Sequence, residues 1–239
     1  MFYESSDWHS NPDGLIPEAK DFIKLAKAVG ARVIACGDLF NLLPMGRESF
    51  LGSMAVRELI EALDGYPMDY VSGNHDPYPW VRELFGEVPN IHIIRALDLE
   101  MNGRLYHFTH GHQYAIDWAI LRHIAPGFVE FMVEHLPYPW YAFSKRMGWV
   151  PGQIKPRIKE SYRESQRYND ATGIIWRNAI REAQRKNYCV VLGHTHTTAQ
   201  LRRFIDTEVG IRTVMIDGGD LREGSFVIGG GGDVELAFL

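Results

Sequence analysis

The chain has 239 residues and a formal net charge of −5, with 46% hydrophobic and 23% charged residues, an ordinary composition for a soluble globular protein. It has no run near the roughly 18 apolar residues that a membrane-spanning helix needs. Met1–Ser5 lacks the basic and apolar regions of a signal peptide, so we expect a cytoplasmic protein. Cys36 and Cys189 stand within apolar stretches, which favours buried free thiols over a disulfide.

The first seventy residues alternate between strand-like and helix-like patterns. Strands are predicted at Phe2–Ser6, Arg32–Cys36 and Met68–Ser72, and helices from about Pro17 and over Glu48–Asp64. The side chains of the second helix that we expect to point inward are Leu51, Met54, Ala55, Leu59 and Leu63. A glycine follows each helix, where it suits a helix end. This order predicts a βαβαβ unit with parallel strands.

The remaining strand signals favour antiparallel pairing. Leu97–Thr109 contains Asn102-Gly103 between two apolar runs, which is a strong hairpin signal. Further strand-like runs are Ala199–Ile205, Ile211–Ile216, Ser225–Ile228 and Val234–Phe238, with a loop expected at Gly229–Gly232. The chain therefore predicts a sheet that begins parallel and ends antiparallel, or two such sheets packed together.

The segment Gln113–Tyr188 differs from the rest of the chain. It reads as helices, carries twelve Lys and Arg against seven Asp and Glu, and holds thirteen aromatic residues. Such a segment either forms a helical subdomain with its own core or presents apolar and basic surface to an anionic ligand. We therefore expect one domain over residues 1–239, with residues 113–188 as a helical cap inserted into it.

Five short pieces place His, Asp or Asn beside glycine, each just after a strand-like run. They are Ser6-Asp7-Trp8-His9, Gly37-Asp38, Gly73-Asn74-His75-Asp76, His110-Gly111-His112 and Gly193-His194-Thr195-His196. Open α/β sheets bind ligands beyond the carboxyl ends of their strands. These oxygen and nitrogen ligands suit Mn²⁺, Fe or Zn²⁺. Two such ions about 3.5–4 Å apart clamp a phosphoryl group and supply hydroxide near neutral pH. Asp38 is the natural bridge.

The motifs D-x-H, G-D, G-N-H-D, H and G-H-x-H, in this order, resemble those of the calcineurin-like metallophosphoesterases. The resemblance implies a four-layer αββα sandwich, in which two mixed β-sheets are flanked by helices. It also implies the metal ligands: Asp7, His9 and His196 on one ion, Asn74, His110 and His194 on the other, and Asp38 as the bridge. By the same resemblance His75 faces the substrate and helps to stabilise or protonate the leaving group. Asp76 would orient His75.

Within that family, Gly37-Asp-Leu-Phe40, His110-Gly111 and Gly193-His-Thr-His196 resemble the UDP-2,3-diacylglucosamine pyrophosphohydrolases, whose helical lid grips acyl chains. Two positions depart from that branch, which commonly has arginine in place of His75 and aspartate in place of His112. The resemblance implies a dinuclear hydrolase of phosphodiester or pyrophosphate bonds, with a metal-bridging hydroxide as nucleophile. Mn²⁺ is the ion we expect first, followed by Fe, Zn²⁺ or Ni²⁺.

The alternatives are a broad-specificity phosphodiesterase or phosphomonoesterase, a nuclease, and a non-catalytic binding scaffold. Outside Gln113–Tyr188 the charge balance is −10, which argues against a nucleic-acid partner. The expected partner is a phosphate-ester small molecule, which is amphiphilic for the UDP-2,3-diacylglucosamine pyrophosphohydrolases. Peripheral membrane contact is compatible with such a partner. Three residues are candidate substrate contacts: Asn41, His112 and Arg157. For each an alternative remains open: turn capping, replacement of His110 as ligand, and helical surface charge, respectively.

Overall fold

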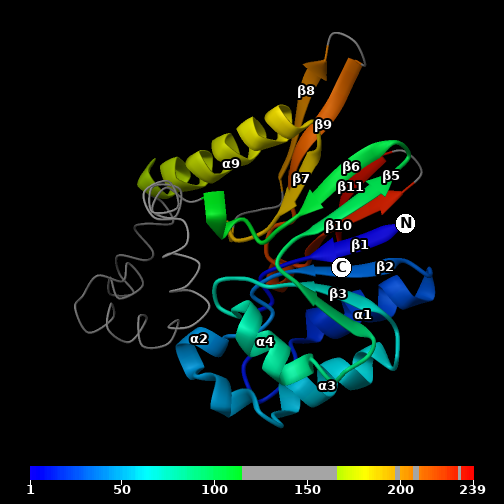
Figure 1. Cartoon of the computed structure of the whole chain (residues 1–239), viewed down its shortest axis with the longest axis vertical. Coiled ribbons are helices and arrows are strands. Elements are labelled where there is room, and N and C mark those ends of the chain that lie inside the picture. Colours follow the sequence, from blue (N-terminus) through cyan, green and yellow to red (C-terminus); the bar gives the residue numbers. More distant parts are fainter. Residues whose placement is uncertain (115–165, 197–199, 207–209, 231–232) are drawn as a thin grey trace.

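The computed structural model describes residues 1–114, 166–196, 200–206, 210–230 and 233–239. Two β-sheets pack face to face (Figure 1). In spatial order the six-stranded sheet contains β11 (Asp233–Phe238), β10 (Ser225–Gly230), β1 (Phe2–Ser5), β2 (Arg32–Cys36), β3 (Met68–Val71) and β4 (Ile91–Ile94). The five-stranded sheet contains β5 (Leu97–Met101), β6 (Arg104–Phe108), β7 (Cys189–Leu192), β9 (Gly210–Asp217) and β8 (Gln200–Asp206).

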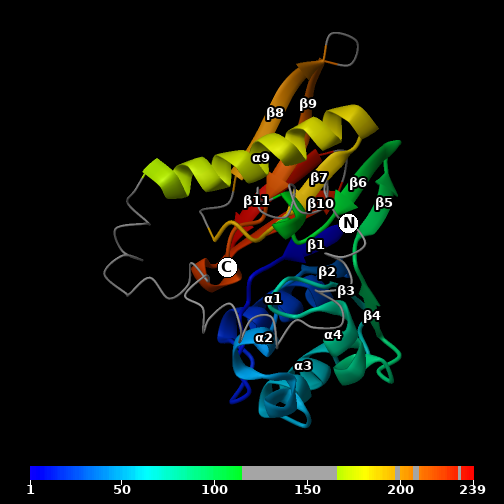
Figure 2. The same ribbon diagram turned by 60° about the vertical axis from the view of Figure 1, so that its left-hand side comes forward.

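Both sheets are mixed. Strands β1 to β4 run parallel, while β10 pairs antiparallel with β1 and β11 with β10. In the second sheet β6, β7 and β9 are parallel, with antiparallel β5 and β8 at the edges. Helices α1 (Pro17–Ala28), α3 (Met54–Leu63) and α4 (Tyr78–Phe85) cover the outer face of the six-stranded sheet, and α9 (Gln166–Lys186) covers the other sheet (Figures 1 and 2). The predicted sandwich of two mixed sheets flanked by helices is confirmed.

The alternation of side chains along β1 fixes which layer each residue joins. Phe2 faces the five-stranded sheet, where its ring meets Phe108 edge-on at 4.9 Å between centroids. Tyr3 points the other way, into the helix-facing core with Phe22 and Phe226. Each large apolar side chain buried in these layers stabilises the fold by about 1.5–3 kcal/mol.

The two cysteines are buried and do not form a disulfide, as the sequence predicts. Cys36 and Cys189 both lie in the apolar layer between the sheets. At the hairpin, Asn102 and Gly103 have φ of +52° and +73°, which confirms the turn expected from this pair.

The helix predicted over Glu48–Asp64 is wrong in its first half. The chain instead forms a short helix α2 (Leu42–Met45) and a 3-10 turn η1 (Arg47–Phe50), and α3 begins only at Met54. Gly52 has a φ of +67°, and the Ser53 side chain accepts a hydrogen bond from the Val56 N–H, so a new helix start is built there. Leu51 and Met54, both predicted to be buried, are 52% exposed.

Other differences concern elements and loops. The pair α4 and β4 was not predicted. Gly229 and Gly230, which were expected in a loop, belong instead to β10, where a Cβ on Gly229 would overlap the ring of Phe2. Of the predicted cap, residues 115–165 lie outside the described residues. None of the helices in the described ranges has the length and apolarity needed to cross a bilayer.

Candidate metal centre

The carboxyl ends of β1, β2 and β3 in one sheet, and of β6 and β7 in the other, bring the five predicted pieces together. Potential ligand atoms lie within 4.8 Å of one another in three groups: Asp7 with His9 and His196, Asp38 with His9 and His75, and Asp38 with His110 and His194. Asn74 joins the third group, because its Oδ1 is 2.9 Å from His110 Nε2. All seven predicted ligands and His75 therefore meet at one place.

The backbone of the centre is held in an uncommon conformation. Five of its non-glycine residues have left-handed φ angles between +48° and +71°: Asp7, His9, Asp38, His194 and His196. This region typically costs of order 1 kcal/mol or more per residue, and persists where surrounding structure imposes it. Here hydrogen bonds from the Asp7 N–H to Gly37 O (3.1 Å) and from the His9 N–H to Asp38 O (2.8 Å) join the first two loops.

Two glycines leave room for the ligands. A Cβ on Gly73 would overlap the Asp38 carboxylate and backbone. A Cβ on Gly193 would overlap the side chain of Ser6 and come within 2.6 Å of Asp7 Oδ2. The glycines that the sequence places beside these motifs are therefore required by space.

Three ligand atoms are buried without a hydrogen-bond partner: Asp7 Oδ1, His9 Nε2 and Asp38 Oδ2. Asp7 Oδ1 faces His9 Nε2 at 3.7 Å and His196 Nε2 at 3.5 Å, while Asp7 Oδ2 accepts the His194 N–H at 2.8 Å. An unsatisfied buried charge costs several kcal/mol. Oxygen and nitrogen lone pairs aimed at a common point fit a divalent cation.

The charges of the centre are coupled through Asp38. Burial opposes ionisation of His110, but the Asp38 carboxylate, 3.2 Å from its Nε2, outweighs burial and raises the pKa of His110 to about 10. Burial, and then the charge of His110, lower the pKa of His194 to about 3. A proton on His110 would balance the charge of Asp38, and a metal ion bound to His110 Nε2 would have to displace it.

Three of the candidate ligand histidines have their Nδ1 atom held by an oxygen acceptor, whereas His194 Nδ1 lies 3.1 Å from His110 Nε2. His9 Nδ1 lies 2.9 Å from Asn41 Oδ1, and His110 Nδ1 lies 2.9 Å from the Cys36 carbonyl oxygen. His196 Nδ1 lies 3.3 Å from Asp220 Oδ2. An acceptor at Nδ1 fixes the proton there and leaves Nε2 for a metal.

Asn41, a candidate substrate contact, is hydrogen-bonded to the loop that carries His9, which favours a structural role for it. Its Oδ1 faces His9 Nδ1, and its Nδ2 donates to His9 O at 2.8 Å and to Asn11 Oδ1 at 3.0 Å. The side-chain amide clamps the loop that carries His9.

Asp76 does not orient His75, which corrects the role implied by the resemblance. Its Oδ1 accepts the N–H groups of Asp38 (3.0 Å) and Gly73 (2.6 Å). Its Oδ2 accepts the Leu39 N–H (2.7 Å) and the Tyr70 hydroxyl (2.5 Å). Asp76 thus ties the loop after β2 to the loop after β3. Burial, and then the charge of Asp38, raise the pKa of Asp76 to about 7.

His75 lies beside the centre with its ring perpendicular to that of His9, 4.9 Å between centroids. Its backbone N–H donates to Asp38 Oδ1 at 2.7 Å, and its carbonyl accepts the Leu43 N–H at 2.8 Å. Its Nδ1 is buried without a hydrogen-bond partner. Burial lowers the pKa of His75, so the imidazole is neutral near pH 7. This geometry suits either a substrate-facing group or a further ligand.

The other two candidate substrate contacts have different outcomes. His112 begins the 3-10 turn η2 (His112–Tyr114) directly after Gly111, which has a φ of +106°. The ring of His112 lies 5.6 Å from that of His110 and 6.2 Å from that of His194, outside the three ligand groups. Arg157 lies outside the described residues.

Two buried aspartates that sequence reasoning missed brace the second sheet's side of the centre. Asp217 Oδ2 accepts the Trp176 Nε1–H and the Thr195 hydroxyl, each at 2.7 Å. Asp217 Oδ1 accepts the Gly219 N–H at 3.1 Å, and burial raises the pKa of this carboxyl to about 7. Asp220 faces His196. The signal was present as Asp-Gly-Gly-Asp after a strand-like run, but it has no histidine and resembles a turn.

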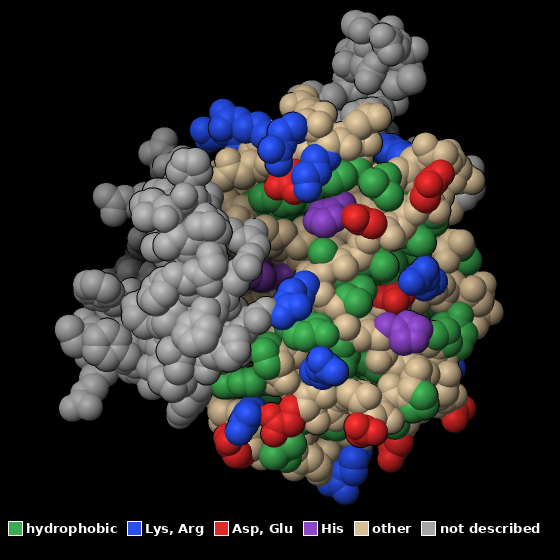
Figure 3. Space-filling model, viewed as in Figure 1, with side chains coloured by type: hydrophobic (Ala, Val, Ile, Leu, Met, Phe, Trp, Pro, Cys, Tyr) green, Lys and Arg blue, Asp and Glu red, His purple; other side chains and the backbone are tan. Residues whose placement is uncertain are grey.

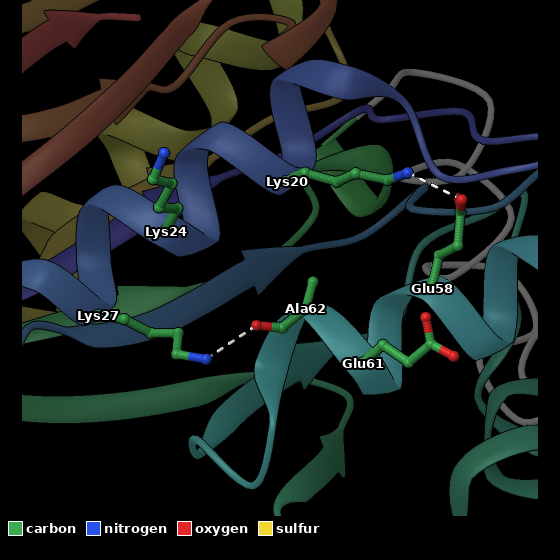
Figure 4. A pocket seen from close by; sticks show the side chains of 6 residues that line it. All are labelled: Lys20, Lys24, Lys27, Glu58, Glu61 and Ala62. Carbon is green, nitrogen blue, oxygen red and sulfur yellow. Dashed lines mark hydrogen bonds and ion pairs between the residues drawn. The ribbon is translucent and has the colours of Figure 1, made fainter.

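A cavity of about 460 Å³ lies elsewhere, between α1 and α3. Its lining is drawn in Figure 4: Lys20, Lys24, Lys27, Glu58, Glu61 and Ala62. Lys20 pairs with Glu58 at 2.9 Å, and Lys27 Nζ donates to the Ala62 and Leu63 carbonyl oxygens near the end of α3. None of the predicted site residues lines it, so it is a groove between two helices away from the chemistry.

No family model and no curated protein matches the chain. Solved structures similar to it include an archaeal phosphodiesterase, at 14% identity and a TM-score of 0.47 over 100% of this chain and 99% of that one. A predicted phosphoesterase from Streptococcus pneumoniae is 14% identical, with a TM-score of 0.40 over 99% of this chain and 88% of that one. A Thermotoga maritima protein solved by NMR is 17% identical, with a TM-score of 0.37 over 100% of both chains.

Proposed function

We propose that this protein is a hydrolase of phosphodiester or pyrophosphate bonds that holds two divalent metal ions at the carboxyl ends of its two sheets. The observation that carries the proposal is a set of three buried candidate ligand atoms that make no hydrogen bond: Asp7 Oδ1, His9 Nε2 and Asp38 Oδ2. A bound cation would offset the free-energy cost of burying these atoms. It would also offset the repulsion between the two aspartates of the cluster.

The ligand groups support the division that the family resemblance implies. One ion would be held by Asp7, His9 and His196, and the other by Asn74, His110 and His194. Asp38 is proposed as the bridge because it belongs to a group on each side. Two ions so held would clamp the oxygens of a phosphoryl group and make hydroxide available near neutral pH. The mixed nitrogen and oxygen set suits Mn²⁺ first, and Fe, Zn²⁺ or Ni²⁺ as well.

His75 is the proposed substrate-facing group. Because burial keeps the free imidazole neutral, it carries one N–H with which to donate a hydrogen bond to a phosphate or leaving-group oxygen. The negative charge of a bound phosphate favours a second proton on the ring, which then passes to the leaving oxygen.

For the substrate, we propose a small phosphate ester with an apolar portion, of which UDP-2,3-diacylglucosamine is the specific candidate. The motif resemblance supports it, and so does an exposed basic stripe on α9. Arg177, Arg181 and Arg185 recur every four residues and are exposed, so they lie along one face of the helix, and Lys and Arg gather over α9 in Figure 3. A broad-specificity phosphodiesterase is the alternative.

Metal analysis and substrate comparison test this function together. Protein purified without chelator should hold about two ions per chain and hydrolyse bis(4-nitrophenyl) phosphate, and Mn²⁺ should restore the activity that chelation removes. UDP-2,3-diacylglucosamine should be cleaved at a higher kcat/KM than the nitrophenyl ester. Two bound ions without turnover of any phosphate ester would make the protein a scaffold, and preferred, salt-sensitive cleavage of DNA would make it a nuclease. Absence of bound ions would overturn the metal centre itself.

The insertion is proposed to set substrate selectivity. Replacing residues 115–165 by a Gly/Ser linker retains α9 and the ligand loops. Hydrolysis of the nitrophenyl ester should be largely kept, and hydrolysis of the long-chain substrate should collapse. Equal loss of both activities in a folded, metal-loaded variant would reduce the insertion to a structural element.

A further inference from the structure

The three ligand histidines with a held Nδ1 differ in the acceptor that holds it. His9 faces a neutral side-chain amide and His110 faces a backbone carbonyl, whereas His196 faces a carboxylate. Among these contacts, the one from Asp220 is the one that brings a full negative charge to the outer nitrogen of a metal-ligand candidate. A carboxylate behind a ligand histidine makes the imidazole a stronger donor than a neutral acceptor does.

Hydrogen bonds from Arg222 fix the orientation of the Asp220 carboxylate. It is 4% exposed, and its Oδ1 accepts both the backbone N–H and the Nε–H of Arg222 at 2.9 Å. Its Oδ2 is 3.1 Å from Arg222 Nε and also accepts from Arg222 Nη2. A two-pronged guanidinium contact leaves the carboxylate little freedom to rotate away from His196.

The turn that carries Asp220 is joined to loops on both sides of the centre. The Leu221 N–H donates to Ser6 O at 3.2 Å, and the Ser6 hydroxyl donates to Gly219 O at 2.9 Å. The Gly218 N–H donates to Leu192 O, at the end of β7, at 2.8 Å. The turn is therefore fixed against the loop that carries Asp7 and against the strand that leads to His196.

We propose that Asp220, locked by Arg222, is a positioning residue that keeps the proton of His196 on Nδ1 and so strengthens the metal site formed by Asp7, His9 and His196. The inference rests on the proposed function for the identity of that site. With the proton on Nδ1, the lone pair of His196 Nε2 points toward the space beside Asp7 Oδ1, 3.5 Å away. At the other site the described Nδ1 contacts involve no carboxylate: Cys36 O faces His110 Nδ1, and His194 Nδ1 lies 3.1 Å from His110 Nε2.

Arg222 offers a competing geometry, which makes the proposal testable. Its Nη2 lies 3.4 Å from His196 Nδ1, against 3.3 Å for Asp220 Oδ2. If Arg222 donated to Nδ1, the proton would sit on Nε2 and that nitrogen could not bind a metal. The two arrangements predict opposite tautomers.

The test compares Asp220→Asn, which keeps an oxygen acceptor but loses the charge, with Asp220→Ala. Asp98→Asn is the matched control, because Asp98 also pairs with a histidine, His107 at 2.6 Å, away from the centre. Chelator-treated proteins are titrated with Mn²⁺ and with Zn²⁺ against an indicator dye. We expect Asp220→Ala to bind one of the two ions roughly 10- to 100-fold more weakly than wild type. Asp220→Asn should weaken the binding of that ion by less. In both variants the affinity for the other ion should change less than about twofold.

¹⁵N NMR of the histidine rings of metal-free protein gives an independent readout. Wild type should show His196 protonated on Nδ1, and Asp220→Ala should move the proton population toward Nε2. Wild-type affinity for both ions in both Asp220 variants would overturn the proposal, and so would an Nε2-protonated His196 in wild type. Equal weakening of both ions would show a structural role instead. Wild type that binds no metal would refute the proposed function, while the NMR result would still decide the tautomer.

Discussion

The two sheets contribute different chemistry to one centre. The six-stranded sheet supplies both carboxylates, Asp7 and Asp38, together with His9, Asn74 and His75, whereas the five-stranded sheet supplies histidines alone. The negative charges of the candidate ligands therefore lie on the six-stranded sheet, and the five-stranded sheet contributes only imidazole nitrogens. Neither sheet alone carries a complete ligand set for either proposed ion, so the centre exists only when the sheets pack.

The loops on each side are braced by a buried aspartate that faces away from the metals. On the six-stranded side, Asp76 accepts three backbone N–H groups and one hydroxyl. On the other side, Asp217 accepts from Trp176, Thr195 and Gly219. The carboxylates of this centre therefore fall into two kinds. Asp7 and Asp38 each keep an oxygen without a hydrogen bond and are the proposed metal ligands, whereas Asp76 and Asp217 have both oxygens hydrogen-bonded and hold loops in place.

The largest effect should come from removing a carboxylate from the six-stranded side. Asp38→Asn should lose both ions and reduce turnover by about 10³-fold or more, because several kcal/mol of charge stabilisation disappear. His110→Ala, on the histidine side, should lose one ion only. Metal content per folded chain measures the difference, with Asp98→Asn as the control. Retention of both ions by Asp38→Asn would contradict its role as a bridge.

His75→Ala should reduce kcat by ~10²–10⁴-fold while both ions stay bound, because the proposed role of His75 is toward the substrate. The loss should shrink for substrates with good leaving groups, such as nitrophenol. His107→Ala, a histidine paired with Asp98 outside the centre, is the matched control. Loss of an ion in His75→Ala would instead make His75 a ligand, which its grouping with His9 and Asp38 also allows.

Asp76→Ala should destabilise the metal-free protein by about 2–4 kcal/mol, because four donors lose their acceptor inside the fold. Asp217→Ala, which frees three donors on the other sheet, should cost less. Urea unfolding at pH 7 measures both. An Asp76 variant as stable as wild type would show that the loops after β2 and β3 hold their shape without this brace.

The smallest expected effect concerns Glu4, which lies on β1 between the sheets and is fully buried. Burial raises its pKa from 4.5 to about 8, so the folded state holds a proton that the unfolded chain releases. This contribution to stability is present below pH 4.5 and is lost as the pH rises through 8. Between pH 6 and 8 wild type should lose about 2 kcal/mol relative to Glu4→Gln, measured by urea unfolding without metal. Parallel pH profiles would contradict the shift.

Much of the centre could be predicted from the sequence because strand, glycine and ligand stand next to one another in the chain. Asp38 follows β2 by two residues, and His194 follows β7 by two, so local pattern alone places them at strand ends. Asn41 and Asp76 were also predicted to belong to the site, but their hydrogen bonds were not predicted. These bonds depend on which groups from other loops face each side chain. That information comes from contacts such as Asp76 with Leu39, 37 positions apart.

The fold shows the same limit. Ser53 caps α3 after Gly52, and these two residues were read as the interior of a longer helix because the apolar spacing continues through Leu51 and Met54. The apolar spacing alone could not show that the side chains of Leu51 and Met54 are exposed. Asp220 was missed for a further reason: its partner His196 stands 24 positions away in the sequence and becomes a neighbour only through the pairing of β9 with β7.

The position of β1 has a consequence for how the chain is synthesised. This strand is synthesised long before β10, which begins at Ser225, yet in the finished sheet it lies between β2 and β10. Until β10 leaves the ribosome, the nascent sheet presents the hydrogen-bonding groups of β1 as an open edge, beside the loop that will carry Asp7 and His9. Open edges are templates for wrong pairing, and closing a loop of this length is slow. We therefore expect the growing chain to depend on chaperones until β10 has been made.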